Sequence, residues 1–99
     1  MLNPRQRQFL KARAHALKPV LHVGKSGVTP ALVEEIALVI ESLELIKVKL
    51  NRNSFEDEDS VAKVLLERMP GLEHVWTIGH TILLFRPSQE RPSRYVLPT

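Results

Sequence analysis

Apolar residues recur at helical spacing in three segments of the chain. An Asn-Pro pair at residues 3–4 puts a capping residue before proline at the first helical position, which predicts a helix over residues 4–16. A Thr-Pro pair at residues 29–30 repeats this signal, and apolar residues at i, i+3 and i+4 spacing predict a second helix that ends near residue 43. A third helix is predicted over residues 60–68, between a run of acids and a Pro-Gly pair.

Four other segments have the length and composition of strands. Residues 20–23 are short and apolar, which predicts a buried strand. Residues 45–50 alternate, with apolar side chains on one side and two lysines on the other, so a half-buried strand is expected there. Residues 72–78 and 81–86 predict two further strands, and the Gly-His pair between them suits a type II′ hairpin turn.

The resulting order, α-β-α-β-α-β-β, is typical of the α/β class. Alternating strands and helices favour parallel pairing through right-handed crossovers, and the last hairpin adds an antiparallel strand. We therefore predict a single compact domain over residues 1–86, with helices packed on a mixed four-stranded sheet and a loop over residues 51–55. Residues 87–99 are rich in proline and polar residues, which predicts an extended or weakly docked tail.

Charge is segregated along the chain, which has 99 residues and a formal net charge of +3. Residues 1–28 carry six lysines and arginines and no acid, residues 29–46 carry four glutamates and no base, and residues 47–55 are again basic. Neighbouring cations sum into one field that attracts a phosphate backbone. The alternative is a solvated helix face that binds nothing, and the charge pattern alone leaves both interpretations open.

The helix predicted at residues 4–16 presents much of this basic charge. We expect its cations to form one continuous patch with the loop after the first strand and with the two lysines of residues 45–50, provided that the helix packs beside the first strand. The cations of this predicted patch are Arg5, Arg7, Lys11, Arg13, Lys18, Lys25, Lys47 and Lys49.

The segment VGKSG, residues 23–27, carries the most specific candidate chemistry. Its Gly-Lys-Ser triplet resembles the end of a P-loop, but the first glycine of that motif is replaced by Pro19, so no nucleotide triphosphate site is predicted. A glycine pair can instead bring the backbone close to a sugar-phosphate chain, with Lys25 and the start of the next helix attracting its charge. KH domains clamp single-stranded nucleic acid with such a GXXG loop. The alternative is that Gly24 and Gly27 only form a tight turn.

The other residues argue against catalysis, cofactors and metals. The chain has no cysteine, so it has no disulfide or thiolate metal site, and its four histidines lack ligand spacing. The acids at residues 56–59 favour a helix start over a magnesium site, because four consecutive side chains cannot point into one site. Neither a membrane span nor a signal peptide is indicated, so we expect a cytoplasmic protein. We also expect a monomer that is not an enzyme and has no small-molecule substrate.

Contact with a protein partner is the main alternative function. It would use Trp76 and Phe85, or the acidic face of the second helix. We expect both aromatic residues to be in the core or half-buried, and we expect the glutamates to face solvent away from any nucleic acid. These glutamates are Glu34, Glu35, Glu41 and Glu44.

Three segments together resemble a known family. They are LNPRQRQFLKARAHALKPVLHVGKSGVTPALVEEI, LELIKVKL and WTIGHTILLFRP, in that order along the chain. They are similar to the CRM domain, named for chloroplast RNA splicing and ribosome maturation, and specifically to its small stand-alone bacterial form, the YhbY-like proteins. The resemblance covers residues 2–86 and implies a fold similar to the C-terminal domain of bacterial translation initiation factor three.

The resemblance implies RNA binding without catalysis, since bacterial members associate with precursors of the large ribosomal subunit. The family loop falls on Gly24, Lys25, Ser26 and Gly27, and its basic helix falls on Arg5, Arg7, Lys11 and Arg13. Two positions depart from the family pattern. Ser26 stands where the family often has asparagine, and His80 stands at the hairpin tip, where the family often has a basic residue. We expect ribosomal RNA to be bound through phosphates and shape, with little base readout because few aromatic residues are expected on the surface. The alternative is a protein-interaction module of the translation machinery with incidental RNA affinity.

Overall fold

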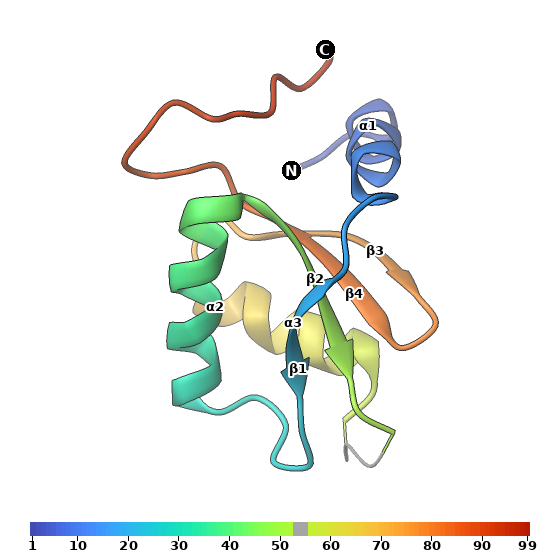
Figure 1. The fold of residues 1–99 in the computed structure, drawn as a ribbon, viewed down its shortest axis with the longest axis vertical. Coiled ribbons are helices and arrows are strands. Elements are labelled where there is room, and N and C mark those ends of the chain that lie inside the picture. The colour runs from blue at the N-terminus through green and yellow to red at the C-terminus, as the bar shows by residue number, and fades with distance from the viewer. Residues whose placement is uncertain (53–55) are drawn as a thin grey trace.

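Seven elements follow the predicted order in the computed structural model, which describes residues 1–52 and 56–99 (Figure 1). The helices are α1 (Pro4–Ala14), α2 (Pro30–Leu43) and α3 (Glu58–Arg68). The strands are β1 (Pro19–Val23), β2 (Leu45–Leu50), β3 (Glu73–Ile78) and β4 (Thr81–Phe85). The loop expected over residues 51–55 lies mostly outside the described residues. The predicted α/β class and order of elements are confirmed.

The strands form a mixed four-stranded sheet in the order β1-β2-β4-β3, counted over the described residues. β1 runs parallel to β2, and β4 is antiparallel to both β2 and β3. The expected parallel pairing of β2 with β3 is wrong, because β4 lies between them. β4 buries every residue from Ile82 to Phe85, which suits a central strand with both faces covered, whereas β3 buries only Val75 and suits an edge.

The first strand also differs from the prediction. β1 is an edge strand and not a buried one, with Leu21 and Val23 buried and Val20 and His22 exposed. Its alternation means that only one face packs on the core. At the other end of the sheet, Gly79 has a φ of +56° in the two-residue turn between β3 and β4, as a type II′ turn requires of its first residue.

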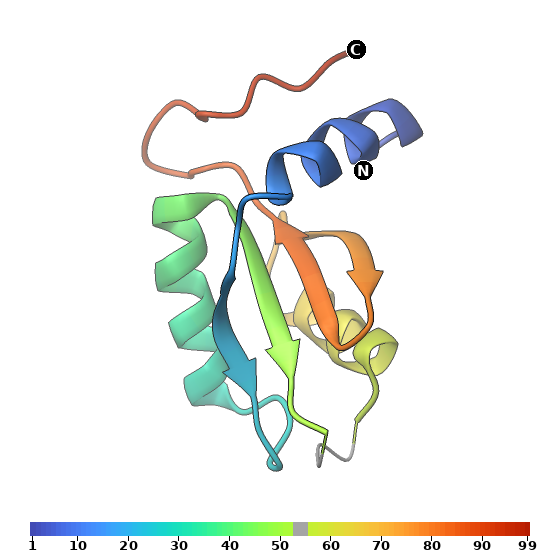
Figure 2. The same cartoon turned by 45° about the vertical axis from the view of Figure 1, so that its right-hand side comes forward.

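The two faces of the sheet are covered unequally. Helices α2 and α3 pack over one face on an apolar core that includes Val23, Ile46, Val48, Ile82 and Leu84. Helix α1 covers only one end of the other face, where Leu10 and Ala14 pack on Leu45, Val75, Leu83 and Phe85. Figure 2 shows α1 lying across this end, away from the loop that joins β1 to α2. The remainder of the second face, called here the open sheet face, carries Val20, His22, Lys47, Lys49, Trp76, Ile78 and Thr81.

Helices α1 and α2 begin at the capping residues that the sequence indicates, and α3 begins at Glu58, two residues before its predicted start. Asn3 Oδ1 accepts a hydrogen bond from the Gln6 N–H at 2.8 Å, and Thr29 Oγ1 accepts one from the Leu32 N–H at 3.1 Å. Asp57 caps α3 through the Ser60 N–H at 2.8 Å, so this run of acids serves a helix start. Within the described ranges, every helix is too short or too polar to cross a bilayer.

Residues 87–99 form neither helix nor strand and pass over the ends of α2 and α1 (Figures 1 and 2). The Tyr95 ring meets the Phe85 ring edge-on with centroids 5.9 Å apart, and Gln6 Nε2 donates a hydrogen bond to the Pro98 carbonyl at 3.1 Å. Glu41 accepts hydrogen bonds from the Ser88 hydroxyl and the Gln89 N–H. The tail therefore closes the apolar cluster under α1.

Glu44 holds the tail from the end of α2, and its solvent-facing placement in the sequence prediction is wrong. The side chain is 3 % exposed and accepts hydrogen bonds from the Ser93 hydroxyl and, at 3.0 Å, from the Arg94 N–H. Burial acts to raise the pKa of Glu44, but these hydrogen bonds outweigh it and hold the pKa below the ordinary 4.5. Glu44 is the C-cap of α2, where the backbone leaves the helix at a φ of +67°.

Replacing Glu44 with glutamine should lower the free energy of unfolding by about 1–3 kcal/mol near neutral pH, since the charged acceptor of two hydrogen bonds is lost. A carboxyl whose pKa is lowered by folding adds stability above its unfolded pKa and loses it as the pH falls through the folded pKa. The wild type should therefore lose stability below about pH 4.5 more steeply than the variant does. Urea unfolding followed by circular dichroism measures both slopes. Glu67→Gln, an exposed carboxyl on α3, is the matched control, and equal slopes for Glu44→Gln and wild type would contradict the prediction.

Candidate nucleic-acid interface

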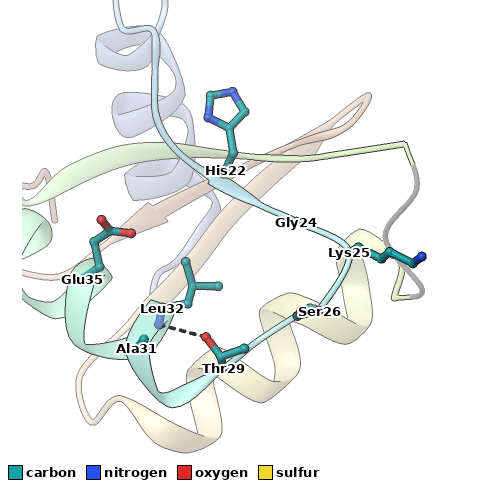
Figure 3. Close-up of a pocket in the computed structure, with 9 residues that line it drawn as sticks. His22, Gly24, Lys25, Ser26, Thr29, Ala31, Leu32 and Glu35 are labelled. Carbon is teal, nitrogen blue, oxygen red and sulfur yellow. Dashed lines mark hydrogen bonds between the residues drawn. The ribbon is translucent and has the colours of Figure 1, made fainter.

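The glycine loop predicted from VGKSG lies between β1 and α2 and borders an open cavity of about 450 Å³. Figure 3 shows the Lys25 side chain pointing outward from the tip of the loop, with Ser26 beside it and the start of α2 below. The residues that line the cavity are His22, Gly24, Lys25, Ser26, Gly27, Thr29, Ala31, Leu32 and Glu35. The structure therefore brings the four predicted loop residues to one cavity at the start of a helix.

The two glycines of the loop have different roles in its geometry. Gly27 is buried, has a φ of +69° and donates its N–H to the Gly24 carbonyl at 3.1 Å, which closes the turn. This conformation favours glycine, because a Cβ is strained there. Gly24 has no such φ, and among the described residues a Cβ added to it would meet only Asn51 Nδ2, at 4.0 Å. Gly27 thus makes the turn, and Gly24 leaves the backbone open to an approaching chain.

The start of α2 offers an anion fewer donors than a typical helix N-terminus. Pro30 has no N–H, and the Leu32 and Val33 N–H groups both donate to Thr29, at 3.1 and 3.0 Å. The Ala31 N–H, on the cavity wall, is the candidate donor that remains in the first turn. The positive end of the helix dipole still faces the cavity, so anions are favoured there.

Two carboxylates lie near the loop. Glu35 lines the cavity, which contradicts the prediction that the glutamates of α2 all face away from the site. The carboxyl carbon of Glu56 lies 3.3 Å from the point where a Cβ on Gly27 would stand. These charges oppose Lys25, so the loop by itself is a weak cationic site, and a polyanion needs cations beyond it.

The open sheet face supplies such cations next to the loop. His22 on β1 is the register partner of Lys49 on β2, and both side chains are exposed. Lys47 lies one step further along β2, but its Nζ donates a hydrogen bond to the Leu17 carbonyl at 2.9 Å. Lys18 is exposed beside the tail, where it borders a small cavity with Arg94 and Tyr95.

Helix α1 lies at the opposite end of the sheet from the glycine loop (Figures 1 and 2). It packs on β2 and β3, so the condition for one compact patch, a first helix beside β1, is not met. The reason is that its apolar residues, Leu10 and Ala14, fit the apolar end of the sheet at Leu45 and Phe85. The predicted cations therefore fall into two groups, joined only by the open sheet face.

The basic residues of α1 divide between internal contacts and solvent. Arg7 Nη1 donates hydrogen bonds to the carbonyls of His74 and Val75, at 2.6 and 2.8 Å. Lys11 Nζ lies 3.9 Å from the centre of the Trp76 ring. Arg5 and Arg13 are exposed, and Arg13 lies over the ring of Phe9 at 4.8 Å. The stripe predicted for RNA contact is therefore turned mainly toward β3.

Two exposed residues near these cations, His22 and Trp76, were not predicted as RNA-binding residues. His22 alternates with the buried Leu21 and Val23, so a half-buried pattern for β1 would have identified it. Trp76 is 38 % exposed, so it is half-buried and not in the core, and Phe85 is buried; both agree with the expectation. A register shift between His74 and Trp76 determines which face of the sheet Trp76 lies on, and no local sequence pattern predicts this shift.

Comparisons with known proteins agree with this architecture. A family model described as the CRS1 / YhbY (CRM) domain matches residues 2–86. The Bacillus subtilis protein named "Probable RNA-binding protein YqeI" is 41 % identical over 90 residues, which cover 91 % of this chain and 93 % of that protein. A Haemophilus influenzae protein named "RNA-binding protein" is 37 % identical over 89 residues, which cover 90 % of this chain and 89 % of that protein.

A solved structure extends the match to three dimensions. The solution structure of a Staphylococcus aureus protein, described there as a candidate RNA-binding protein, matches with a TM-score of 0.81 at 33 % identity. The match covers 99 % of this chain and 100 % of the other. With a family model over most of its length and relatives above 30 % identity, this chain belongs to the CRS1/YhbY (CRM) domain family.

Proposed function

We propose that this protein binds RNA without catalysis, through the glycine loop and the adjoining open sheet face. One observation carries the proposal: a loop with an exposed lysine and a bare backbone opens directly onto a sheet face whose charged side chains are basic. Named RNA-binding relatives in the same family support it.

The proposed path of the RNA follows β1 and β2. It begins at Lys25, passes Gly24, crosses the neighbouring His22 and Lys49, and ends near Lys47 under the last turn of α1. A five-residue strand spans about 17 Å, so a few nucleotides could reach from the loop to the helix. Contacts along this path are lysines, His22 and backbone groups, which bind phosphates and carry little sequence information.

The proposed RNA is a precursor of the large ribosomal subunit, with the protein acting in the cytoplasm during ribosome assembly. The family resemblance supports this choice, because bacterial YhbY-like proteins associate with such precursors. Crosslinking in cells followed by sequencing of the bound RNA tests it directly. We expect crosslinks to concentrate in precursor ribosomal RNA, and recovery of mainly messenger or transfer RNA would overturn this part of the proposal.

A protein-interaction function is the second candidate, favoured by one acidic groove. The groove, of about 410 Å³, lies between α2 and the tail, and the strongly exposed Leu38 borders it. Its charged lining residues are Glu34, Glu41, Glu90 and Arg86, so acids outnumber bases. A basic protein segment would suit it. Salt weakens both contacts, so the ligand separates the two functions: labelled RNA tests the first, and a labelled basic peptide tests the second.

Replacing Lys25 with alanine should weaken binding to RNAs of different sequence by similar factors, because the residue is expected to contact phosphate. The slope of log affinity against log salt should fall by about one unit or less. Fluorescence anisotropy of labelled RNA over a series of salt concentrations measures both effects. Lys63→Ala, an exposed lysine on α3, is the matched control. An unchanged slope for Lys25→Ala would remove Lys25 from the interface.

A further inference from the structure

Trp76 occupies an unusual position for a tryptophan in a sheet. It is 38 % exposed on the open sheet face, beside Ile78, which is 54 % exposed. The register shift between His74 and Trp76 places buried Val75 under α1, while Trp76 pairs with Leu83 at the margin of the helix. The ring is therefore fixed by the sheet on one side and accessible from the other.

The surroundings of Trp76 are cationic. Lys11 Nζ stands 3.9 Å from the ring centre. Lys47, His15 and Thr81 line the same cavity of about 100 Å³, and none of the described residues that line it is acidic. An apolar surface with a basic rim is suited to a ligand that is flat and apolar in one part and anionic in another.

We propose that Trp76 stacks one unpaired base of the bound RNA, with Lys11 and Lys47 placed for the phosphates on either side of it. This inference rests on the proposed function and adds a ligand class to it: RNA with an unpaired nucleotide. The Lys11 ammonium covers the ring in the free protein, and its flexible side chain can swing onto a phosphate when a base replaces it.

Charge favours a nucleic acid over an apolar protein segment as the occupant. A protein segment would have to cover Lys11 and Lys47 without neutralising them, whereas an RNA strand brings phosphates at the same points. Stacking on an indole tolerates every base, because each base has a π face. The site therefore selects for unpaired RNA without selecting a sequence, and it modifies the expectation that aromatic contacts are scarce.

Trp76 is the single tryptophan of the chain, so its fluorescence reports this site alone. Three probes separate the contributions: a short single-stranded oligoribonucleotide, the same strand in a duplex, and a strand of equal length whose bases are removed. We expect the single strand to quench the fluorescence at saturation. The duplex and the base-free strand should bind with a salt dependence but leave the fluorescence nearly unchanged.

Variants test the stacking contact by affinity. Trp76→Leu keeps an apolar side chain but removes the π face, and it should lower affinity for the single strand by about 5-fold or more while leaving the duplex unaffected. Trp76→Phe should stay within about 2-fold of wild type. Leu66→Ala on α3 is the matched control, because Leu66 is 40 % exposed and lies on the other side of the sheet. Circular dichroism establishes that each variant is folded.

Distinct results would overturn the two proposals. Salt-dependent RNA binding with unchanged Trp76 fluorescence, and with full affinity in Trp76→Leu, would remove the stacking site and leave the phosphate-binding surface in place. Absence of salt-dependent binding to all three probes would overturn the proposed function itself. Burial of Trp76 that depends on protein concentration in the absence of RNA would assign the patch to self-association.

Discussion

Replacing Gly27 with valine is expected to destabilise the protein by about 2–4 kcal/mol, because the position requires a left-handed backbone and an added side chain would crowd the Glu56 carboxyl group. Its φ is +69°, and a Cβ would stand 3.3 Å from the carboxyl carbon of Glu56. A β-branched side chain is especially poor in that conformation. Gly27→Asn should lose less stability than Gly27→Val, since asparagine tolerates a positive φ better. Urea unfolding monitored by circular dichroism measures the difference.

Gly24→Leu supplies the contrast that separates folding from binding. The position has an ordinary φ, and the nearest described atom to an added Cβ is Asn51 Nδ2 at 4.0 Å, so stability should change by less than about 0.5 kcal/mol. RNA affinity should nevertheless fall, because the side chain would hold the sugar-phosphate chain away from the loop. If folded Gly24→Leu binds RNA as the wild type does, the loop makes no close backbone contact, and the cations alone account for binding.

The elements could be predicted because their signals are local. Asn3, Thr29 and the acids before α3 each mark a helix start within one turn, and the alternation over β2 identifies its buried face without knowledge of any neighbour. Strand order could not be predicted in this way. Whether β3 or β4 lies beside β2 depends on which strand can bury both faces, and this is a comparison between distant segments.

The same distinction explains which parts of the site were predictable. The glycine loop is contiguous in sequence, so its four residues necessarily arrive together, and the structure adds only that Gly27 forms the turn. The position of α1 depends on how Leu10 and Ala14 fit the far end of the sheet. The exposure of Trp76 depends on a register shift in β3. Both are products of tertiary packing, which periodicity along one segment does not report.

Replacing Arg7 with alanine should lower the free energy of unfolding by about 2–3 kcal/mol, although a stripe of cations on a surface helix suggests a role in binding alone. The guanidinium donates to the carbonyls of His74 and Val75 at 2.6 and 2.8 Å, where the register of β3 shifts. Hydrogen bonds from a charged donor are worth more than neutral ones, and truncation leaves both acceptors without it. Thermal and urea unfolding measure the loss.

Arg13→Ala is the matched control, because Arg13 lies on the same helix but is exposed. It should leave stability within about 0.5 kcal/mol of wild type. Arg13 is a candidate for a phosphate contact. If it makes that contact, Arg13→Ala should lower the slope of log RNA affinity against log salt. Arg7→Ala, measured where the variant is folded, should leave that slope close to the wild-type value.

The titration of His74 gives an independent test of the Arg7 contact. Burial lowers the pKa of His74 below the ordinary 6.5, the charge of Asp59 acts against this shift, and the charge of Arg7 adds to it. The Arg7→Ala variant should therefore show a higher His74 pKa by NMR, and Arg13→Ala should not. An unchanged His74 pKa together with a reduced salt slope in Arg7→Ala would mean that the guanidinium reaches RNA and not β3. In that case α1 would contribute its whole basic stripe to the interface, and the RNA path would extend across the helix.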